Sequence, residues 1–362
     1  YQSYFATVVN QVSSIVTLLP TIAKGIESVN SIGEVLLSED IEDNEGKEKL
    51  EQVTGTFDFE DVCFHYKNNE HNVLNHLNLH VKSGETIALV GESGAGKSTI
   101  LNLVIGFNQA ESGKVLIDGK DISKIDLRTY RKHLAVVPQT SILFSGTIRD
   151  NITYGCENVS EEELQKVIKA ANLSDLIASL PKGLDTMVGE HGGKLSGGQR
   201  QRIGIARALA TNPRFIVCDE AVSALDVSIQ AQVINMFEEL QEKLGVAYLF
   251  IAHDLLVVHH ISDRIAVMYL GRIVEIADSN ELNDNPMHPY TQSLLSAVPY
   301  PDPKMAKERQ RIVLEGDVPS PLHMPSGCAF RTRCRYATEK CAQECPSLTD
   351  RGNGHQVACW NK

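Results

Sequence analysis

The segment that most constrains this chain is a glycine-rich stretch between an apolar run and a helical pattern. Residues 91–98 read Gly-Glu-Ser-Gly-Ala-Gly-Lys-Ser and match G-x-x-x-x-G-K-[ST] in full. The apolar run 86–90 precedes them, and the pattern predicts a helix from Lys97 to about Val104. Glycines let backbone N–H groups line a small concavity, to which the helix N-terminus adds partial positive charge. The stretch therefore predicts a phosphate-binding loop in an α/β fold.

Each type of side chain in this loop has an expected role. The expected contact residues are Gly91, Glu92, Ser93, Gly94, Ala95, Gly96, Lys97, Ser98 and Thr99. Lys97 is expected to neutralise the outer phosphates of a nucleotide, and Ser98 to offer its hydroxyl to Mg²⁺. A chance glycine-rich turn is the plain alternative, and the strand–loop–helix context disfavours it.

A second apolar run, residues 215–218, ends in two carboxylates, Asp219 and Glu220. Ligands bind at the carboxyl ends of strands in parallel sheets. We therefore expect Asp219 to hold Mg²⁺, directly or through water, and Glu220 to polarise an attacking water. The run alone is weak evidence, and it gains weight from the phosphate-binding loop.

Residues 195–199 read Leu-Ser-Gly-Gly-Gln and precede a basic helical pattern. Two readings of this segment are open. It offers a second helix N-terminus suited to phosphate. It also fits a plain helix cap, because Ser is a favoured N-cap residue, and the residues alone favour the cap.

Composition narrows the class of protein. The 34 Lys and Arg against 46 Asp and Glu give a net charge of −12, which argues against a general nucleic-acid-binding surface. Hydrophobic residues make up 42% of the chain, enough for a sizeable folded core. Apolar patterns predict strands at 57–64, 77–81 and 247–252, helices within 160–180 and a hairpin at 264–275. After Ser279 the pattern turns proline-rich and irregular.

The two ends of the chain are unusual. Residues 1–23 carry no charge and have the length of a membrane span, yet they include Pro20 and several polar residues. They predict a marginal span, the inner end of one, or an amphipathic helix packed on a partner. The helical pattern continues to Leu37, and residues 38–54 predict an acidic linker.

Five of the eight cysteines follow residue 327: Cys328, Cys334, Cys341, Cys345 and Cys359. No secretory signal opens the chain, so a disulfide-stapled secreted protein is not expected. The absence of a C-x-x-C pair makes a zinc ribbon a poor match. Reduced thiols and a metal site both remain open. The nearby arginines 331, 333 and 335 would favour an anionic cluster, but their plainer interpretation is a solvated basic face.

Taken together, these motifs resemble the ATP-binding cassette (ABC) ATPases over about residues 55–275. The residues that carry the resemblance are Tyr66, the loop 91–98, Gln139, residues 195–199, Asp219, Glu220, residues 223–226 and His253. The resemblance implies an α/β P-loop NTPase cassette (residues 55–278) with an antiparallel β edge and a helical subdomain at about 140–205. A Cys-rich C-terminal extension, residues 279–362, follows it.

The resemblance also implies roles. Tyr66 would stack on adenine, His253 would contact the γ-phosphate, and Gln139 would touch Mg²⁺ and the attacking water. Two cassettes would form a head-to-tail dimer in which Ser196, Gly197, Gly198 and Gln199 complete the opposing ATP site, with Asp226 at the interface. The implied partners are a second ABC ATPase, as homo- or heterodimer, and membrane permease domains, with no nucleic acid. The implied place is the cytoplasmic face of the plasma (inner) membrane, with attachment through residues 1–23 as one option.

Two subfamilies are represented. Residues 1–195 resemble an ABC exporter with the end of its last membrane helix, as in the segments 28–36, 143–152 and 188–192. Residues from about 200 are similar to oligopeptide and dipeptide importer subunits, as in the segments 227–232 and 288–291. The chain is therefore an apparent chimera, with three origins open: a natural recombinant, an engineered chimera or an assembly artefact. In the importers Cys328, Cys334, Cys341 and Cys359 would be the positions for a [4Fe–4S] cluster or Zn²⁺.

The cargo is open between a peptide, which the C-terminal residues favour, and an unknown solute of a truncated exporter, which residues 1–37 favour. A non-transport ABC ATPase acting on nucleic acid is a third hypothesis, and the acidic charge counts against it.

Overall fold

The computed structural model describes residues 1–37, 42–67, 71–156, 158–189, 192–223, 225–252, 254–298, 311–320 and 324–361. They form two compact units, Tyr1–Glu45 and Gly46–Lys362, which are described separately.

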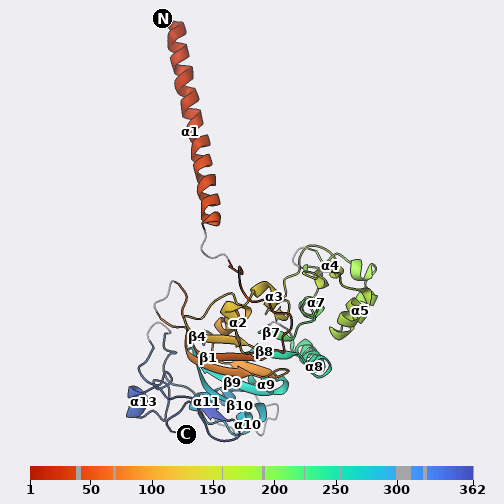
Figure 1. The fold of residues 1–362 in the computed structure, drawn as a ribbon, viewed down its shortest axis with the longest axis vertical. Helices are drawn as coiled ribbons and strands as arrows, with labels where there is room; N and C mark the ends of the chain where they lie inside the picture. Colours follow the sequence, from red (N-terminus) through yellow and green to blue (C-terminus); the bar gives the residue numbers. More distant parts are fainter. Residues whose placement is uncertain are drawn as a thin grey trace. The chain divides into compact units, whose positions relative to one another are not determined.

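The first unit is one long helix, α1 (Gln2–Leu36), which runs through Pro20 without a break (Figure 1). None of its residues is buried, and an 18-residue window reaches a mean hydropathy of 1.4. A helix of 35 residues is about 50 Å long, more than the hydrocarbon core of a bilayer. By length and composition alone α1 can therefore cross a membrane. Whether residues 1–23 form a span, the inner end of one or an amphipathic helix packed on a partner stays a prediction.

The second unit is built on an eight-stranded mixed sheet in the order β11-β12-β10-β9-β3-β8-β7-β6. Its parallel strands are β3 (Thr86–Val90), β6 (Leu134–Val137), β7 (Phe215–Asp219), β8 (Ala247–Ala252) and β9 (Arg264–Tyr269). All residues of β3 and β8 are buried, as expected of parallel strands covered on both faces. β10 (Arg272–Asp278) pairs with β9 in the hairpin that the sequence predicts.

A second sheet, antiparallel and four-stranded, has the order β2-β1-β4-β5. Its strands are β1 (Phe57–Phe64), β2 (Leu74–Val81), β4 (Ser112–Ile117) and β5 (Lys120–Asp121). Its inner residues share a hydrophobic cluster with α2 (Lys97–Ile105) and one face of the main sheet, and the rings of Phe57 and Phe215 lie 4.3 Å apart. This is the antiparallel β edge that the sequence predicts.

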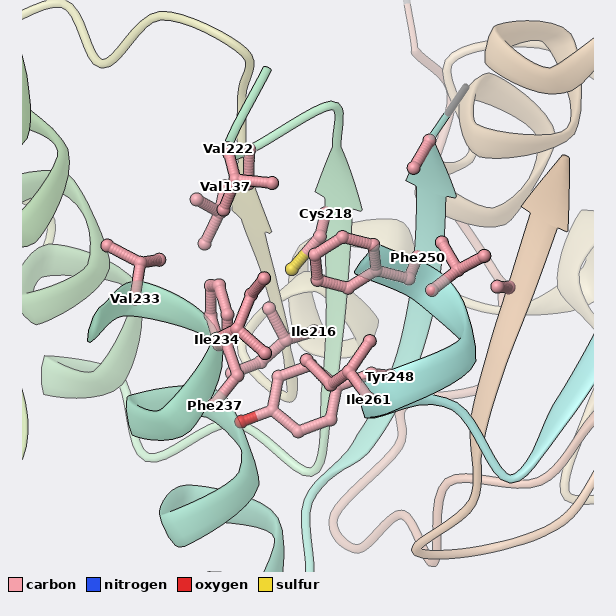
Figure 2. Packing of buried hydrophobic residues seen from close by; sticks show 14 of the residues in the cluster. Val137, Ile216, Cys218, Val222, Val233, Ile234, Phe237, Tyr248, Phe250 and Ile261 are labelled. Carbon is pink, nitrogen blue, oxygen red and sulfur yellow. The ribbon is translucent and has the colours of Figure 1, made fainter. Parts of the chain in front are cut away.

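The other face of the main sheet packs against helices, chiefly α7 (Gly197–Ala210) and α8 (Val227–Leu244). Side chains alternate along β7, so that Ile216 and Cys218 enter this helical cluster. Figure 2 shows Phe237 of α8 between Ile234 and the rings of β8. Its ring meets Tyr248 and Phe250 edge-on at 5.6 and 5.8 Å. Close packing here anchors the strand whose end carries Asp219.

A helical subdomain lies to one side of the strands, shown in green in Figure 1. It contains α4 (Ile148–Ile152), α5 (Glu161–Ala170) and α6 (Ser174–Ser179), and both α4 and α5 contact α7. Capping boxes begin α4 and α5, where Thr147 pairs with Asp150 and Ser160 with Glu163. These helices occupy the predicted range 140–205, and α7 extends it to Ala210. The short α3 (Leu127–Arg131) and α9 (Leu255–Ile261) complete the cassette.

The prediction that the chain is irregular after Ser279 is wrong. The structure has α10 (Ser279–Asp284), α11 (Pro289–Ala297), α13 (Glu339–Gln343), β11 (Thr349–Asp350) and β12 (Gln356–Val357). Side-chain caps explain the first two helices, because Asp278 caps α10 and His288 caps α11, which has Pro289 in its first turn. β12 pairs with β10, so the extension adds strands to the main sheet.

Of the predicted linker 38–54, residues 38–41 lie outside the described residues, and residues 46–54 are not a linker. Residues 46–54 belong to the second unit, where Leu50 and Val53 are buried in the cluster beneath the antiparallel sheet. Glu48 forms a β-bridge with Ile125 and an ion pair with Lys120. The prediction missed the buried Leu50 and Val53 because the segment around them is mostly acidic and polar.

Candidate functional site

The phosphate-binding loop lies between β3 and α2, as the sequence predicts, and two of its glycines are sterically required. A Cβ on Gly91 would lie 2.3 Å from the carbonyl oxygen of Met268. Gly96 has a φ of +99°, and a Cβ there would lie 2.8 Å from a methyl group of Leu74. Only glycine fits both positions without moving the backbone.

Lys97 is held by the loop itself. Its Nζ donates to the carbonyl oxygens of Gly91, at 2.7 Å, and Glu92, at 3.0 Å. Burial lowers the pKa of Lys97, and the carboxylates of Glu220, Asp219 and Glu92 oppose this shift. The ammonium group is thus oriented over the loop, where it suits the phosphates of a nucleotide.

The two carboxylates at the end of β7 lie close to Lys97. Burial raises the pKa of Asp219, the neighbouring Glu220 raises it further, and Lys97 opposes both effects. Glu220 has a φ of +48°, which is uncommon for a residue with a side chain, and its N–H donates to Ile251 of β8. Such strained backbone clusters at functional sites.

Gln139 joins this pair. Its Nε2 donates to Glu220 Oε2 at 3.2 Å and to Ser223 Oγ at 3.1 Å. A cavity of about 400 Å³ brings loop and carboxylate together: its lining is Val73, Ser93, Gly94, Gly96, Lys97, Ser98, Thr99 and Glu220. Ser98, Gln139 and Asp219 offer a hydroxyl, an amide and a carboxylate oxygen. Such a set with one carboxylate fits Mg²⁺, which proteins commonly bind together with the phosphates of the substrate.

Tyr66 lies beside the loop, half exposed. Its hydroxyl is 3.2 Å from Thr99 Oγ1, and its ring meets Phe64 edge-on at 4.9 Å. An exposed ring in this position is available to stack on a flat base. The stacking role of Tyr66 stays a prediction.

Residues 195–199 form the cap that the sequence offers as its plainer reading. The Gln199 N–H donates to Ser196 Oγ at 3.3 Å, and the Ser196 N–H donates to Gln199 Oε1 at 2.9 Å. Asp226 likewise caps α8 through Ile229. The lining of the loop cavity, in the described part of the chain, includes neither segment. Their role in an opposing subunit stays a prediction.

His253, expected at the γ-phosphate, lies outside the described residues. The tail cysteines lie near one another, since Cys328 and Cys334 interact electrostatically with Cys341. Burial raises the pKa of Cys328 to about 11 and also raises that of Cys334, so without a metal both side chains are protonated thiols at neutral pH. Within the described ranges, no group of three or more His, Cys, Asp or Glu side chains could hold a metal ion. As they stand, the thiols do not fit a cluster or Zn²⁺.

The sequence reasoning missed two residues that contact the loop. Tyr290 accepts a hydrogen bond from the Glu92 N–H at 3.0 Å, and Arg333 forms an ion pair with the Glu92 carboxylate. The prediction that Arg333 belongs to a solvated basic face is wrong, because its side chain is only 10% exposed. No local signal could have found either contact, since about 200 residues or more separate the partners.

Comparisons with known proteins agree with this site. Residues 74–223 match the ABC transporter family, and residues 274–341 match the oligopeptide/dipeptide transporter C-terminal region. The chain is 45% identical to a probable peptide ABC transporter ATP-binding protein, y4tS, of Sinorhizobium fredii, over 77% of this chain and 79% of that protein. It is 42% identical to the oligopeptide transport ATP-binding protein AppF of Bacillus subtilis, over 86% and 96%.

The structure of a bacterial Atm1-family ABC exporter with ATP bound is also similar, with a TM-score of 0.68 and 34% identity. The similarity covers 77% of this chain and 48% of the exporter chain, so this chain spans about half the exporter's length. Both predicted likenesses, to peptide-transport proteins and to exporters, are therefore found. The chain belongs to the ATP-binding proteins of the ABC transporter family.

Proposed function

We propose that this chain is the ATP-hydrolysing subunit of an ABC transporter that moves oligopeptides or dipeptides across a membrane. The observation that carries the proposal is the cavity that gathers the phosphate-binding loop and Glu220, with Gln139 bonded to that carboxylate. The match of residues 274–341 to the oligopeptide/dipeptide transporter C-terminal region supports the peptide cargo.

In this mechanism the chain positions the substrate and neutralises charge, as phosphoryl transfer requires. Lys97 exchanges its bonds to the carbonyl oxygens of the loop for phosphate oxygens. Ser98, Asp219 and Gln139 would hold Mg²⁺, which would supply positive charge at the phosphates. Glu220 accepts a hydrogen bond from the attacking water and orients it, while Gln139 donates to the carboxylate. The Ser223 hydroxyl accepts a hydrogen bond from Gln139 and so helps to orient its amide.

Replacing Glu220 by Gln tests this role. The Glu220→Gln variant is expected to keep ATP binding and to lose nearly all hydrolysis, because the amide is a poor base of almost the same shape. Phosphate release and nucleotide binding are measured side by side. Glu242→Gln, on the exposed surface of α8, is the matched control and should hydrolyse ATP normally. Wild-type turnover in Glu220→Gln would remove Glu220 from its assigned role.

The proposed dimer completes each ATP site with Ser196, Gly197, Gly198 and Gln199 of the opposing subunit. Two inactive variants test it, Lys97→Ala in the loop and Ser196→Arg in the segment 195–199. In a head-to-tail homodimer the mixed dimer keeps one intact composite site. Mixing the two variants should therefore recover up to about a quarter of the wild-type rate. A mixture without activity would contradict a composite site in the homodimer.

A permease partner has a candidate docking surface on the helical subdomain. Ile142, Phe144, Tyr154 and Met187 are all exposed there. Phe144 and Tyr154 stack at 4.3 Å, and the Arg207 guanidinium lies over Phe144 at 5.1 Å. Arg207 also donates to backbone oxygens of Ile142 and Asn151, which holds the aromatic pair in place. A rigid exposed aromatic pair suits a protein contact.

The cargo is tested in cells that carry the gene and cells that lack it. A peptide importer makes cells sensitive to toxic dipeptides and tripeptides, so its loss should confer resistance. Unchanged sensitivity would favour the alternative, a cassette of an exporter for another solute. The alignment with AppF covers 86% of this chain, so the likeness to peptide-transport proteins extends well before residue 200. The chimeric origin stays a prediction.

Two finer assignments complete the proposal. α1 would hold the chain at the cytoplasmic face of the inner membrane, and removing residues 1–23 should then release it from washed membranes. The [4Fe–4S] cluster or Zn²⁺ expected at Cys328, Cys334, Cys341 and Cys359 stays a prediction that the arrangement of the described thiols does not support. Iron, sulfide and zinc analysis of protein purified without oxygen tests it.

A further inference from the structure

We propose that the C-terminal extension positions the phosphate-binding loop by holding Glu92 with Tyr290 and Arg333. This inference rests on the proposed nucleotide site and adds residues that no comparison assigns to it. Tyr290 is in α11 and Arg333 lies about 40 residues further on, whereas Glu92 is the second residue of the loop.

Glu92 is a favourable point at which to hold the loop. Its carbonyl oxygen accepts hydrogen bonds from Lys97 Nζ, at 3.0 Å, and from the Ala95 N–H, at 3.2 Å. Its own N–H donates to the Tyr290 hydroxyl at 3.0 Å. Fixing the backbone of Glu92 therefore fixes an acceptor of the lysine that faces the phosphates.

The charge of Glu92 needs a partner. Its carboxylate interacts with Lys97 and, uncompensated, would compete with phosphate for that ammonium group and repel the nucleotide. Arg333 Nη1 lies 3.3 Å from both carboxylate oxygens. The Arg333 side chain is 10% exposed and that of Glu92 33%, so the pair is partly shielded from water. The positive charge of Arg333 thereby compensates the carboxylate and reduces its repulsion of the phosphates.

Both holding residues rest on a rigid base. Tyr290 is fully buried, and its ring packs on Tyr269 of β9 at 4.8 Å and on Phe330 at 5.4 Å. Phe330 also meets Tyr269 edge-on at 5.2 Å. The backbone N–H of Arg333 donates to the carbonyl oxygen of Phe330. A strand of the cassette and two parts of the extension thus form one packed aromatic cluster beneath the loop.

A double-mutant cycle on the full-length protein tests the charge contact. Affinity for ATP is measured with EDTA present, which prevents turnover. Arg333→Gln should weaken ATP binding about five-fold, and in a Glu92→Gln background the same change should have less than a two-fold effect. A merely structural role of Arg333 predicts equal losses in both backgrounds, so equal losses overturn the proposal.

Two further variants separate positioning from folding. Arg335 is exposed, lies two residues after Arg333 and places its guanidinium over the ring of Tyr336. Arg335→Gln removes this positive charge and should bind ATP as the wild type does. Tyr290→Phe keeps the buried ring and removes only the hydroxyl that accepts from Glu92, so ATP binding should weaken several-fold while the aromatic packing survives. Unchanged affinity in both Tyr290→Phe and Arg333→Gln overturns the positioning role alone. Wild-type protein that binds no ATP would refute the proposed function and, with it, this role.

Discussion

His288 makes the stability of the second unit depend on pH. It is buried, with 2% of its surface exposed, and burial lowers the pKa of its imidazole from 6.5 to about 3. Its Nδ1 accepts the Tyr290 N–H at 3.1 Å and so caps α11. A proton on Nδ1 would remove this acceptor and place a charge in a buried site.

The sign and size of the effect follow from linkage. Between pH 6.5 and pH 3 the unfolded chain binds a proton at this histidine and the folded chain does not, so stability falls as pH falls through that window. Above pH 6.5 both states are neutral and the penalty vanishes. At pH 5, one and a half units below the unfolded pKa, the loss is about 2 kcal/mol.

The variant His288→Asn isolates this contribution. Asparagine is a good N-cap residue and does not titrate, so its side-chain oxygen can accept the Tyr290 N–H at every pH. Urea unfolding of both proteins at pH 7.5 and pH 5.0 gives the change in free energy of unfolding for each. The wild type should lose about 2 kcal/mol more than His288→Asn over this range. Equal losses in the two proteins would refute a neutral buried imidazole.

Three further predictions concern packing and binding. Phe237→Ala should lower the free energy of unfolding by about 3–5 kcal/mol, because it leaves a cavity between α8 and β8; a loss below about 1 kcal/mol in urea unfolding would contradict this packing. His355→Ala should cost about 3 kcal/mol by the same measurement, since it leaves the fully buried Glu275 carboxylate without the Nε2 that lies 2.8 Å away. Tyr66→Phe keeps the ring and should bind ATP within about two-fold of the wild type. Tyr66→Ala loses the ring and should bind ATP about ten-fold more weakly. If Tyr66→Ala binds ATP as tightly as the wild type, stacking is excluded.

Local pattern was sufficient for the parts of the cassette where one sequence signal dominates. Strands 57–64, 86–90 and 247–252 have the predicted bounds. The last two are short apolar runs, and in the first apolar and acidic residues are interspersed, as on a half-buried strand. The loop motif predicts where α2 begins, although the contacts that require glycine at positions 91 and 96 come from Met268 of β9 and Leu74 of β2. In the candidate site the approach of Glu220 to the loop followed from strand topology, because parallel strands end at one edge of the sheet.

The remainder depends on contacts between distant residues. β12 is two residues long, and only its pairing with β10 makes it a strand. α10 and α11 span 6 and 9 residues in a proline-containing stretch, so their apolar periodicity is too short to detect, and their caps decide them. The contact of Arg333 with Glu92 joins residues 241 apart and leaves no trace in either local sequence.

The strands of the extension also bear on solubility. β10 would otherwise end the main sheet and present unpaired N–H and C=O groups, on which a strand of another molecule could assemble. β12 occupies that position, and the sheet then ends in β11, a two-residue strand that is exposed and carries Asp350. An edge strand this short and polar is a poor template for aggregation. A chain truncated before Thr349 would leave the edge of β10 unpaired. If it aggregates more than the full-length chain, the last strands protect the sheet edge, a role that is independent of nucleotide binding.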